Sequence, residues 1–189
     1  MIGVLVSGAG TNLQALLDAD LPVVAVASNN TKAKALDRAA QAGIEAGAFP
    51  TAEFDSRERR DEEQAEWLAE RGVELVVLAG YMQLLTTQFL ERFPSRILNV
   101  HPSLLPAFPG AHAVEDALAH GVKVTGATVH FVDEGIDTGP IVLQEAVEVR
   151  EGDTPETLHA RIQAVEHRLL PAAVRLFLDG KLSSPVGAA

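Results

Sequence analysis

Asparagine and histidine lie two residues apart in the segment 99–103 (NVHPS). The apolar run before them predicts a strand over 96–100, and side chains alternate along a strand, so Asn99 and His101 point to the same side. An amide and a protonated imidazole can both donate to a developing oxyanion, and an imidazole can also transfer a proton. The pair therefore favours acyl-transfer chemistry. In the structural alternative, Asn99 bonds a loop backbone and His101 packs against Pro102.

Three carboxylates fall within the predicted loop 133–140 (DEGIDTGP). One of them, buried near His101, would favour the protonated imidazole; the alternative is a solvated turn. The acids lack calcium-loop spacing, and the chain has neither a His-x₃-His pair nor a cysteine. The sequence therefore predicts no metal site.

A glycine-containing turn follows the apolar run 2–6 and opens a helical pattern, in the segment 7–13 (SGAGTNL). Glycines allow a phosphate to approach the backbone closely, and the first amides of a helix attract anions. A dinucleotide-binding motif requires a small residue at position 13, which is Leu here, and an acidic residue at the end of the second strand, which is SNN at 28–30. The turn therefore favours a phosphate or phosphoribosyl group over NAD, with a plain β–α turn as the alternative.

Short apolar runs alternate with helical patterns through the first hundred residues. Because these runs are apolar on both faces, they predict a mostly parallel sheet covered by helices on both sides. We expect strands at 2–6, 22–27, 73–79 and 96–100, and helices after 10 and at 32–41, 56–71 and 86–93.

The pattern changes after residue 120. Segments 125–132 and 141–149 alternate in polarity and predict an antiparallel pair. Thr154 and Pro155 then have the types preferred at a helix start, and apolar residues recur at helical spacing up to Leu176. On this last helix Glu166 is expected to face inward, and Pro171 is expected to kink the helix.

Composition excludes several classes of protein. Of the 189 residues, 47% are hydrophobic and 22% charged, as in soluble globular proteins. A net charge of −11 argues against non-specific nucleic-acid binding, which requires Lys and Arg. The run at 2–6 is too short for a signal or membrane segment and has no basic leader, so we expect a cytoplasmic protein that binds no membrane.

Several motifs together resemble one family, the phosphoribosylglycinamide formyltransferases of the formyltransferase superfamily. They are SGAGTNLQALLD (7–18), SNN (28–30), AGYMQLL (79–85), NVHPSLLPAFPGAHA (99–113), TGATVHFVDEGIDTGPIVLQ (125–144) and VEHRLLP (165–171). The resemblance implies a single-domain, Rossmann-like α/β fold: a mostly parallel twisted sheet with an antiparallel C-terminal strand pair and helices on both faces. It implies a formyltransferase domain over 1–182, with a phosphate-binding N-terminal half and a folate-binding C-terminal half, and a flexible tail at 183–189.

The resemblance also implies an activity, in which 10-formyltetrahydrofolate is the formyl donor and the amine of phosphoribosylglycinamide is the acceptor, without a metal. The implied catalytic residues are Asn99, His101 and Asp137, and the implied acceptor-binding residues are Gly10, Thr11, Asn12 and Glu166. The implied folate-binding residues are Arg57, Met82, Gln83, Leu84, Leu85, Asn99, Asp133, Glu134, Gly135, Ile136 and Asp137.

The chain departs from the family pattern at two positions. Gln83 stands where the family often has Arg, and Ala9 where it often has Asn. Backbone contacts can persist at both places.

The expected partners are small molecules, and a homodimer is a possible assembly. Two rival functions are a formyltetrahydrofolate hydrolase, a branch that carries an extra domain ahead of its core, and a non-catalytic phosphosugar-binding protein.

Overall fold

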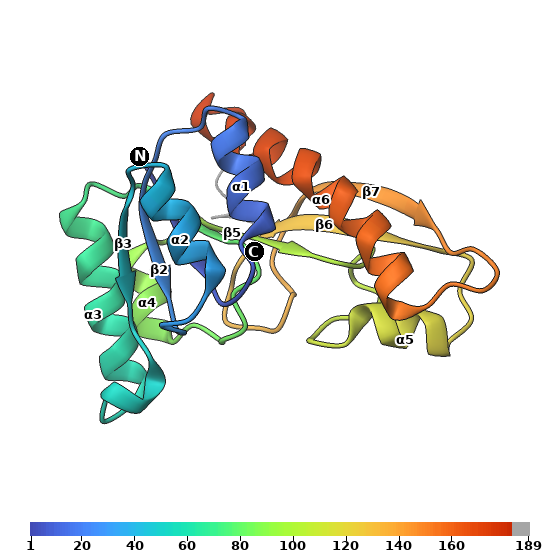
Figure 1. Cartoon of the computed structure of the whole chain (residues 1–189), viewed down its shortest axis with the longest axis horizontal. Helices are drawn as coiled ribbons and strands as arrows, with labels where there is room; N and C mark the ends of the chain where they lie inside the picture. The colour runs from blue at the N-terminus through green and yellow to red at the C-terminus, as the bar shows by residue number, and fades with distance from the viewer. Residues whose placement is uncertain (183–189) are drawn as a thin grey trace, which may run out of the picture. The chain divides into compact units, whose positions relative to one another are not determined.

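The computed structural model describes residues 1–182 (Figure 1). Strands and helices alternate as the sequence predicts, in an α/β fold. The elements are β1 (Ile2–Val6), α1 (Thr11–Asp18), β2 (Val23–Ser28), α2 (Lys34–Gln41), β3 (Glu45–Ala48), the 3₁₀ helix η1 (Thr51–Glu53), α3 (Arg57–Glu70), β4 (Leu75–Leu78), α4 (Thr87–Arg92), β5 (Ile97–His101), α5 (Ala113–Ala119), β6 (Val124–Phe131), β7 (Ile141–Glu148) and α6 (Pro155–Leu178).

The strand order of the sheet is β3-β2-β1-β4-β5-β6-β7. The chain divides into two compact units, residues 1–98 and the residues from Asn99 onward. The predicted extent of one domain over 1–182 stays a prediction, and the tail predicted at 183–189 lies outside the described residues.

In the first unit, β1 lies between β2 and β4 and pairs with both in parallel. All five residues of β1 are buried, which explains why its sequence is an unbroken apolar run. The chain reverses its direction of growth across the sheet at the β1–β4 junction, and α/β folds bind ligands beyond the carboxyl ends of strands at such a point. The loops after β1 and β4 are therefore the expected binding loops of this unit.

Three elements were not predicted from the sequence, namely β3, α5 and the three-residue 3₁₀ helix η1. Strand β3 (EAGA) is short, largely exposed and without a β-branched residue, so it lacks the pattern of a buried strand. Helix α5 has only seven residues, too few for a clear periodic pattern, and it ends at the C-cap His120, followed by Gly121 with a φ of 68°.

In the second unit, β6 and β7 form the predicted antiparallel pair. Helix α6 begins at Pro155, and the expected N-cap Thr154 accepts a hydrogen bond from the Thr157 amide through its side chain. The helix continues through Pro171 to Leu178, and Glu166 lies on its buried side with 4% exposure. No helix within residues 1–182 combines the length and apolar character needed to span a membrane.

Candidate active site

Four polar side chains meet in the second unit. Asn99 and His101 come from the end of β5, His130 from β6, and Asp137 from the loop before β7. The Asp137 carboxylate lies 3.3 Å from His101 Nδ1, 3.5 Å from His130 Nε2 and 3.4 Å from the Asn99 amide nitrogen. The three catalytic residues implied by the resemblance are therefore neighbours in space, although Asp137 is distant from the other two in sequence.

The cluster is largely shielded from water. The side chains of His101, His130 and Asp137 are 6%, 2% and 13% exposed. Charges interact more strongly at such depth than at the surface, because less water screens them. The ion pairs between Asp137 and the two imidazoles are therefore substantial when the rings are protonated.

A short loop holds both members of the His101–Asp137 pair. His101 Nε2 lies 2.8 Å from the carbonyl oxygen of Phe108, and the Gly110 amide donates to Asp137 Oδ2 at 2.8 Å. Phe108 and Asp137 themselves have φ values of 53° and 55°, in the left-handed region that non-glycine residues seldom adopt. Such conformations are destabilising by about 1–3 kcal/mol each and concentrate at functional sites.

Hydrogen-bond chemistry assigns the protons in this cluster. The Phe131 carbonyl only accepts, so His130 donates to it from Nδ1, at 2.7 Å. In the neutral ring, Nε2 then accepts from the Asn99 amide nitrogen at 3.1 Å. His130 Nε2 also faces Asp137, at 3.5 Å, but the Asn99 amide donor is closer. At His101 each nitrogen instead contacts an acceptor, the Phe108 carbonyl at 2.8 Å and Asp137 at 3.3 Å. The arrangement at His101 therefore fits the imidazolium, with a hydrogen on each nitrogen.

The environment of Asp137 favours its ionised form. Burial alone raises the pKa of this carboxyl, but its contact with His130, the hydrogen bond from the Gly110 amide and the charges of both imidazoles when they are protonated outweigh burial and lower the pKa below its ordinary value. Asp137 is therefore an anion at neutral pH and stabilises positive charge on the rings that it faces.

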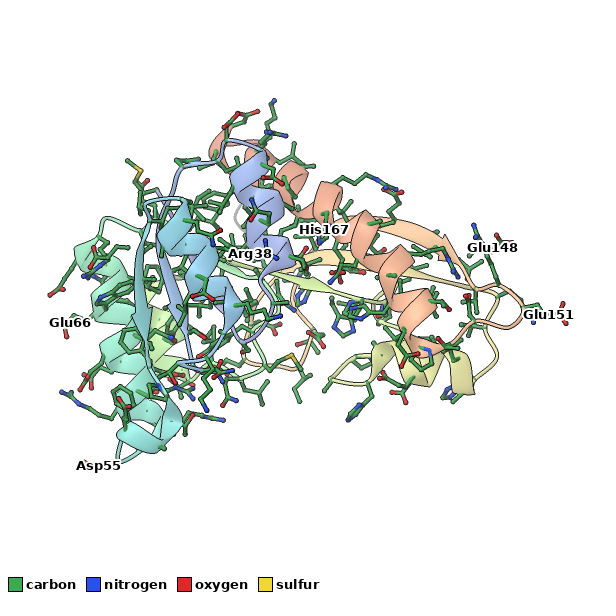
Figure 2. All side chains as sticks on the ribbon, in the orientation of Figure 1. Arg38, Asp55, Glu66, Glu148, Glu151 and His167 are labelled. Carbon is green, nitrogen blue, oxygen red and sulfur yellow. The ribbon has the colours of Figure 1, made fainter. Side chains whose placement is uncertain are left out.

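The loop after β1 has the geometry of an anion site. Gly10 is the N-cap of α1 with a φ of 71°, and a Cβ there would lie 2.6 Å from the Cβ of Ala35. Glycine is therefore required both by the backbone and by the approach of α2. Thr11 and Asn12 begin the helix, where backbone amides lack intrahelical acceptors. Arg38 of α2 donates to the Ala9 carbonyl at 2.9 Å and brings a cation beside the loop (Figure 2).

Within the first unit, the loops after β1 and β4 are joined through Ser7. Its hydroxyl accepts from the Met82 amide at 2.9 Å and donates to the Asn29 side chain at 2.6 Å. Asn29 belongs to the SNN that follows β2. Three loops noted in the sequence for separate reasons therefore meet at the carboxyl ends of adjacent strands.

The segment 82–85, expected to line the folate pocket, exposes apolar side chains. Met82 and Leu84 are 63% and 54% exposed, while the Gln83 side chain accepts a hydrogen bond from Arg60 at 3.3 Å. In the second unit, Ile136 of the acidic loop is 53% exposed. Exposed apolar side chains of this size suit contact with a flat, aromatic ligand.

The remaining predicted residues have individual environments. Arg57 is exposed at the first position of α3, and Glu134 and Gly135 are exposed in the acidic loop. Asp133 accepts from the Gly135 amide and the Thr138 hydroxyl, so its side chain shapes its own loop. Glu166 is buried on α6. Among residues 1–182, no group of three or more His, Cys, Asp or Glu side chains is arranged to hold a metal ion.

Sequence reasoning missed a role for two residues of the cluster. His130 carries no distinct signal in the sequence, because alternation along the strand places it on one face of β6 without showing what that face contacts. Phe108 gave no chemical signal at all, because it contributes a backbone carbonyl. Neither contact could be found before β5 and β6 were placed in space.

Comparison with known proteins agrees with this geometry. The formyl transferase family matches residues 1–174. Phosphoribosylglycinamide formyltransferase of Mycobacterium tuberculosis is 51% identical over 90% of this chain and 81% of its own length, and that of Escherichia coli is 42% identical over 100% and 92%. The crystal structure of glycinamide ribonucleotide transformylase 1 from Symbiobacterium toebii has a TM-score of 0.94 and 54% identity, covering 96% of this chain and 89% of that one.

The chain belongs to the formyl transferase family. The resemblance inferred from the motifs is thereby confirmed, as are the α/β fold with its mostly parallel sheet and the identification of the chain as a folate-dependent formyltransferase. The roles of individual site residues stay predictions.

Proposed function

We propose that this protein transfers the formyl group of 10-formyltetrahydrofolate to the amine of phosphoribosylglycinamide, a step of de novo purine (IMP) biosynthesis. The observation that carries the proposal is the cluster of Asn99, His101, His130 and Asp137 in a chain of the formyl transferase family. Two relatives at 51% and 42% identity bear the name of this activity.

The reaction begins when the neutral amine of the acceptor attacks the formyl carbon. A C–N bond forms, and the carbonyl oxygen becomes an oxyanion that needs hydrogen-bond donors. The Asn99 amide holds two hydrogens, directed at His130 (3.1 Å) and at Asp137 (3.4 Å). The bond to Asp137 is the longer and weaker one, so this hydrogen turns to the oxyanion while His130 keeps the amide oriented.

His101 acts beside Asn99 as an imidazolium. Its contact with Asp137 at 3.3 Å is longer than its bond to Phe108 at 2.8 Å, so the oxyanion shares the hydrogen on Nδ1. The former amine loses a proton and the folate nitrogen gains one as the bond between that nitrogen and the formyl carbon breaks. Asp137 stabilises the imidazolium and, with His101, relays this proton. No nucleophilic side chain is required.

Binding of the two substrates uses other residues. The amides at Gly10, Thr11 and Asn12 bind the acceptor phosphate, supported by the positive end of α1, and Glu166 contacts the glycinamide group. In the first unit, the folate contacts Arg57 and the segment Met82–Leu85. In the second unit, it contacts Asn99 and the loop Asp133–Asp137. A cytoplasmic location fits this role and the absence of cysteine, and a homodimer stays a prediction for sedimentation velocity to test.

One assay separates this function from its rivals. The protein is incubated with 10-formyltetrahydrofolate and phosphoribosylglycinamide, and formylated acceptor, tetrahydrofolate and formate are quantified. We expect formylated acceptor and tetrahydrofolate in equal amounts. Formate released independently of the acceptor would identify a hydrolase. Calorimetric binding of the acceptor without turnover would identify a phosphosugar-binding protein.

A further inference from the structure

An arginine–aspartate pair lies inside the first unit, on helix α3. Arg60 and Asp61 are both 0% exposed, and the guanidinium contacts one carboxylate oxygen through Nη2 at 2.6 Å and through Nε at 2.9 Å. Two charges in the interior require close pairing, because each loses its hydration there. The mechanism proposed above makes no use of this pair.

The remaining polar atoms of the pair bind the segment 81–86 that follows β4. Asp61 Oδ2 accepts from the Thr86 amide at 2.8 Å, and Arg60 Nη1 donates to the Gln83 side chain at 3.3 Å. The same Nη1 donates to the Thr51 hydroxyl at 3.0 Å, which also ties in the η1 helix. One buried pair therefore fixes the middle and the end of this segment.

The start of the segment is attached to the same helix. The Tyr81 hydroxyl donates to Gln64 at 3.3 Å, one helical turn beyond Arg60. Burial raises the pKa of Tyr81 to about 12, so its hydroxyl keeps the hydrogen that it donates. Helix α3 thus holds the segment at Tyr81, Gln83 and Thr86, while Met82 and Leu84 project outward.

This arrangement is not the one that stability alone favours. Apolar residues of similar volume are often as stabilising as a buried ion pair or more so. In addition, the Gln64 side-chain nitrogen and the Thr86 hydroxyl are buried and make no hydrogen bond within residues 1–182. A polar network with unsatisfied members is a poor way to stabilise a core, but it fixes geometry, so positioning is the role that explains it.

The contact with Arg60 explains why Gln83 stands where the family often has Arg. An arginine at position 83 would bring a second guanidinium against that of Arg60, whereas the Gln83 carbonyl oxygen accepts from it. The Gln83 side chain therefore faces α3, which leaves the backbone of this segment and its apolar neighbours to face a ligand.

We propose that Arg60 and Asp61 are positioning residues for the folate, because they hold 81–86 in the conformation that receives it. This proposal rests on the proposed function. The pair acts on folate affinity and leaves the chemical step and the acceptor site unchanged, since neither residue belongs to the loop after β1 or to the cluster around Asp137.

Amide hydrogen exchange of the protein without ligands tests the positioning step on its own. Asp61→Asn keeps the shape and removes the charge that accepts from the Thr86 amide. We expect faster exchange at Thr86 and its neighbours in 81–86, with unchanged exchange in β1 and β4. Unchanged exchange throughout 81–86 would overturn the proposal, whatever reaction the protein catalyses.

Kinetics and tetrahydrofolate binding test the consequence. Arg60→Met leaves Asp61 unpaired and lowers Tm, whereas Arg60→Met with Asp61→Leu removes both charges and recovers Tm. In both variants we expect the folate KM and the tetrahydrofolate Kd to rise about three- to tenfold, the effect of losing one or two hydrogen bonds, with kcat and the acceptor KM retained. Arg59→Met, at an exposed arginine on the same helix, is the matched control and should change none of these values.

The outcomes separate the two proposals. A wild-type protein that neither binds tetrahydrofolate nor transfers formyl would refute the proposed function, while hydrogen exchange would still decide the positioning. A double variant with recovered Tm and wild-type folate KM would refute the positioning proposal alone. Gln83→Ala, made in the wild type and in Arg60→Met, completes a double-mutant cycle. We expect the double variant to raise the folate KM by less than the product of the two single-variant increases. Strict multiplicativity would contradict the coupling of Gln83 to Arg60.

Discussion

Two carboxylates, Asp61 and Asp137, lie beside basic side chains away from solvent, but their partners differ. Asp61 faces a guanidinium, which is always charged, at 2.6 Å and 2.9 Å. Asp137 faces two imidazoles at 3.3 Å and 3.5 Å, whose charge changes with protonation. The first pair is permanent and tight, whereas the second is loose and exchangeable.

The difference indicates how one fold separates positioning from chemistry. A permanent pair cannot transfer a proton at neutral pH, so it holds a segment in place. A histidine can gain and lose a proton near neutral pH, and its longer bonds can be exchanged for bonds to a substrate. We therefore expect substitutions at the two carboxylates to affect different kinetic constants.

The largest effect is expected where the exchangeable cluster meets the oxyanion. Asn99→Ala and His101→Ala should each lower kcat by about 10²–10³, the usual effect of losing one oxyanion donor, and leave acceptor affinity close to that of the wild type. Steady-state kinetics and calorimetry measure the two effects. His159→Ala, at an exposed histidine on α6, is the control. Wild-type turnover in both variants would show that the oxyanion is stabilised elsewhere.

A smaller loss of kcat is expected at His130, which orients the Asn99 amide. His130→Ala removes this acceptor, and one lost hydrogen bond corresponds to about a three- to tenfold loss of kcat. His130→Gln restores an acceptor at that end of the side chain and should recover part of the rate. A higher acceptor KM with unchanged kcat would instead show that His130 contributes to acceptor binding.

A change of about tenfold in the acceptor KM is expected from a substitution in the phosphate-binding loop at Gly10. Gly10→Ala forces a Cβ to within 2.6 Å of Ala35 at a positive φ, so the loop opens and the acceptor KM rises. Gly8→Ala is the matched control, because a Cβ there meets no atom within 4 Å. Removing the phosphate from the acceptor should weaken its binding to the wild type strongly, but should weaken its binding to Gly10→Ala only a little. Equal losses in both proteins would place the phosphate elsewhere.

The smallest effect is a pH dependence of stability. The folded-state pKa of Asp137 is lowered, so its ionised form stabilises the fold above the unfolded value of about 4, and this contribution disappears as the pH falls through the folded-state pKa. The Tm advantage of the wild type over Asp137→Asn should therefore be present at pH 7 and vanish in acid. The exposed Glu134→Gln should show no such trend. A Tm advantage that grows in acid would contradict the charge assignment.

The sequence predicted much of the fold because its signals were local. Apolar runs, the Thr154–Pro155 helix start and the Gly10 turn depend on neighbouring residues alone. Strand β3 was missed because an edge strand need not be apolar, and α5 because seven residues carry little periodicity.

The candidate site was predictable in part. Asn99 and His101 share a face through local alternation, but recognition of Asp137 as their partner came from the resemblance. The roles of His130, Phe108 and the buried Arg60–Asp61 pair depend on tertiary contacts. A charged pair within a helix whose sequence is strongly polar gives no sign that it is buried.

The same substitution at the two carboxylates tests the account most directly. Asp61→Asn and Asp137→Asn each remove one charge with little change of shape, and kcat and the KM of both substrates are measured for each. We predict that Asp137→Asn lowers kcat with both KM values near those of the wild type, while Asp61→Asn keeps kcat and raises the folate KM. A fall in kcat in Asp61→Asn, or an Asp137→Asn variant that changes only the folate KM, would contradict the separation of positioning from chemistry.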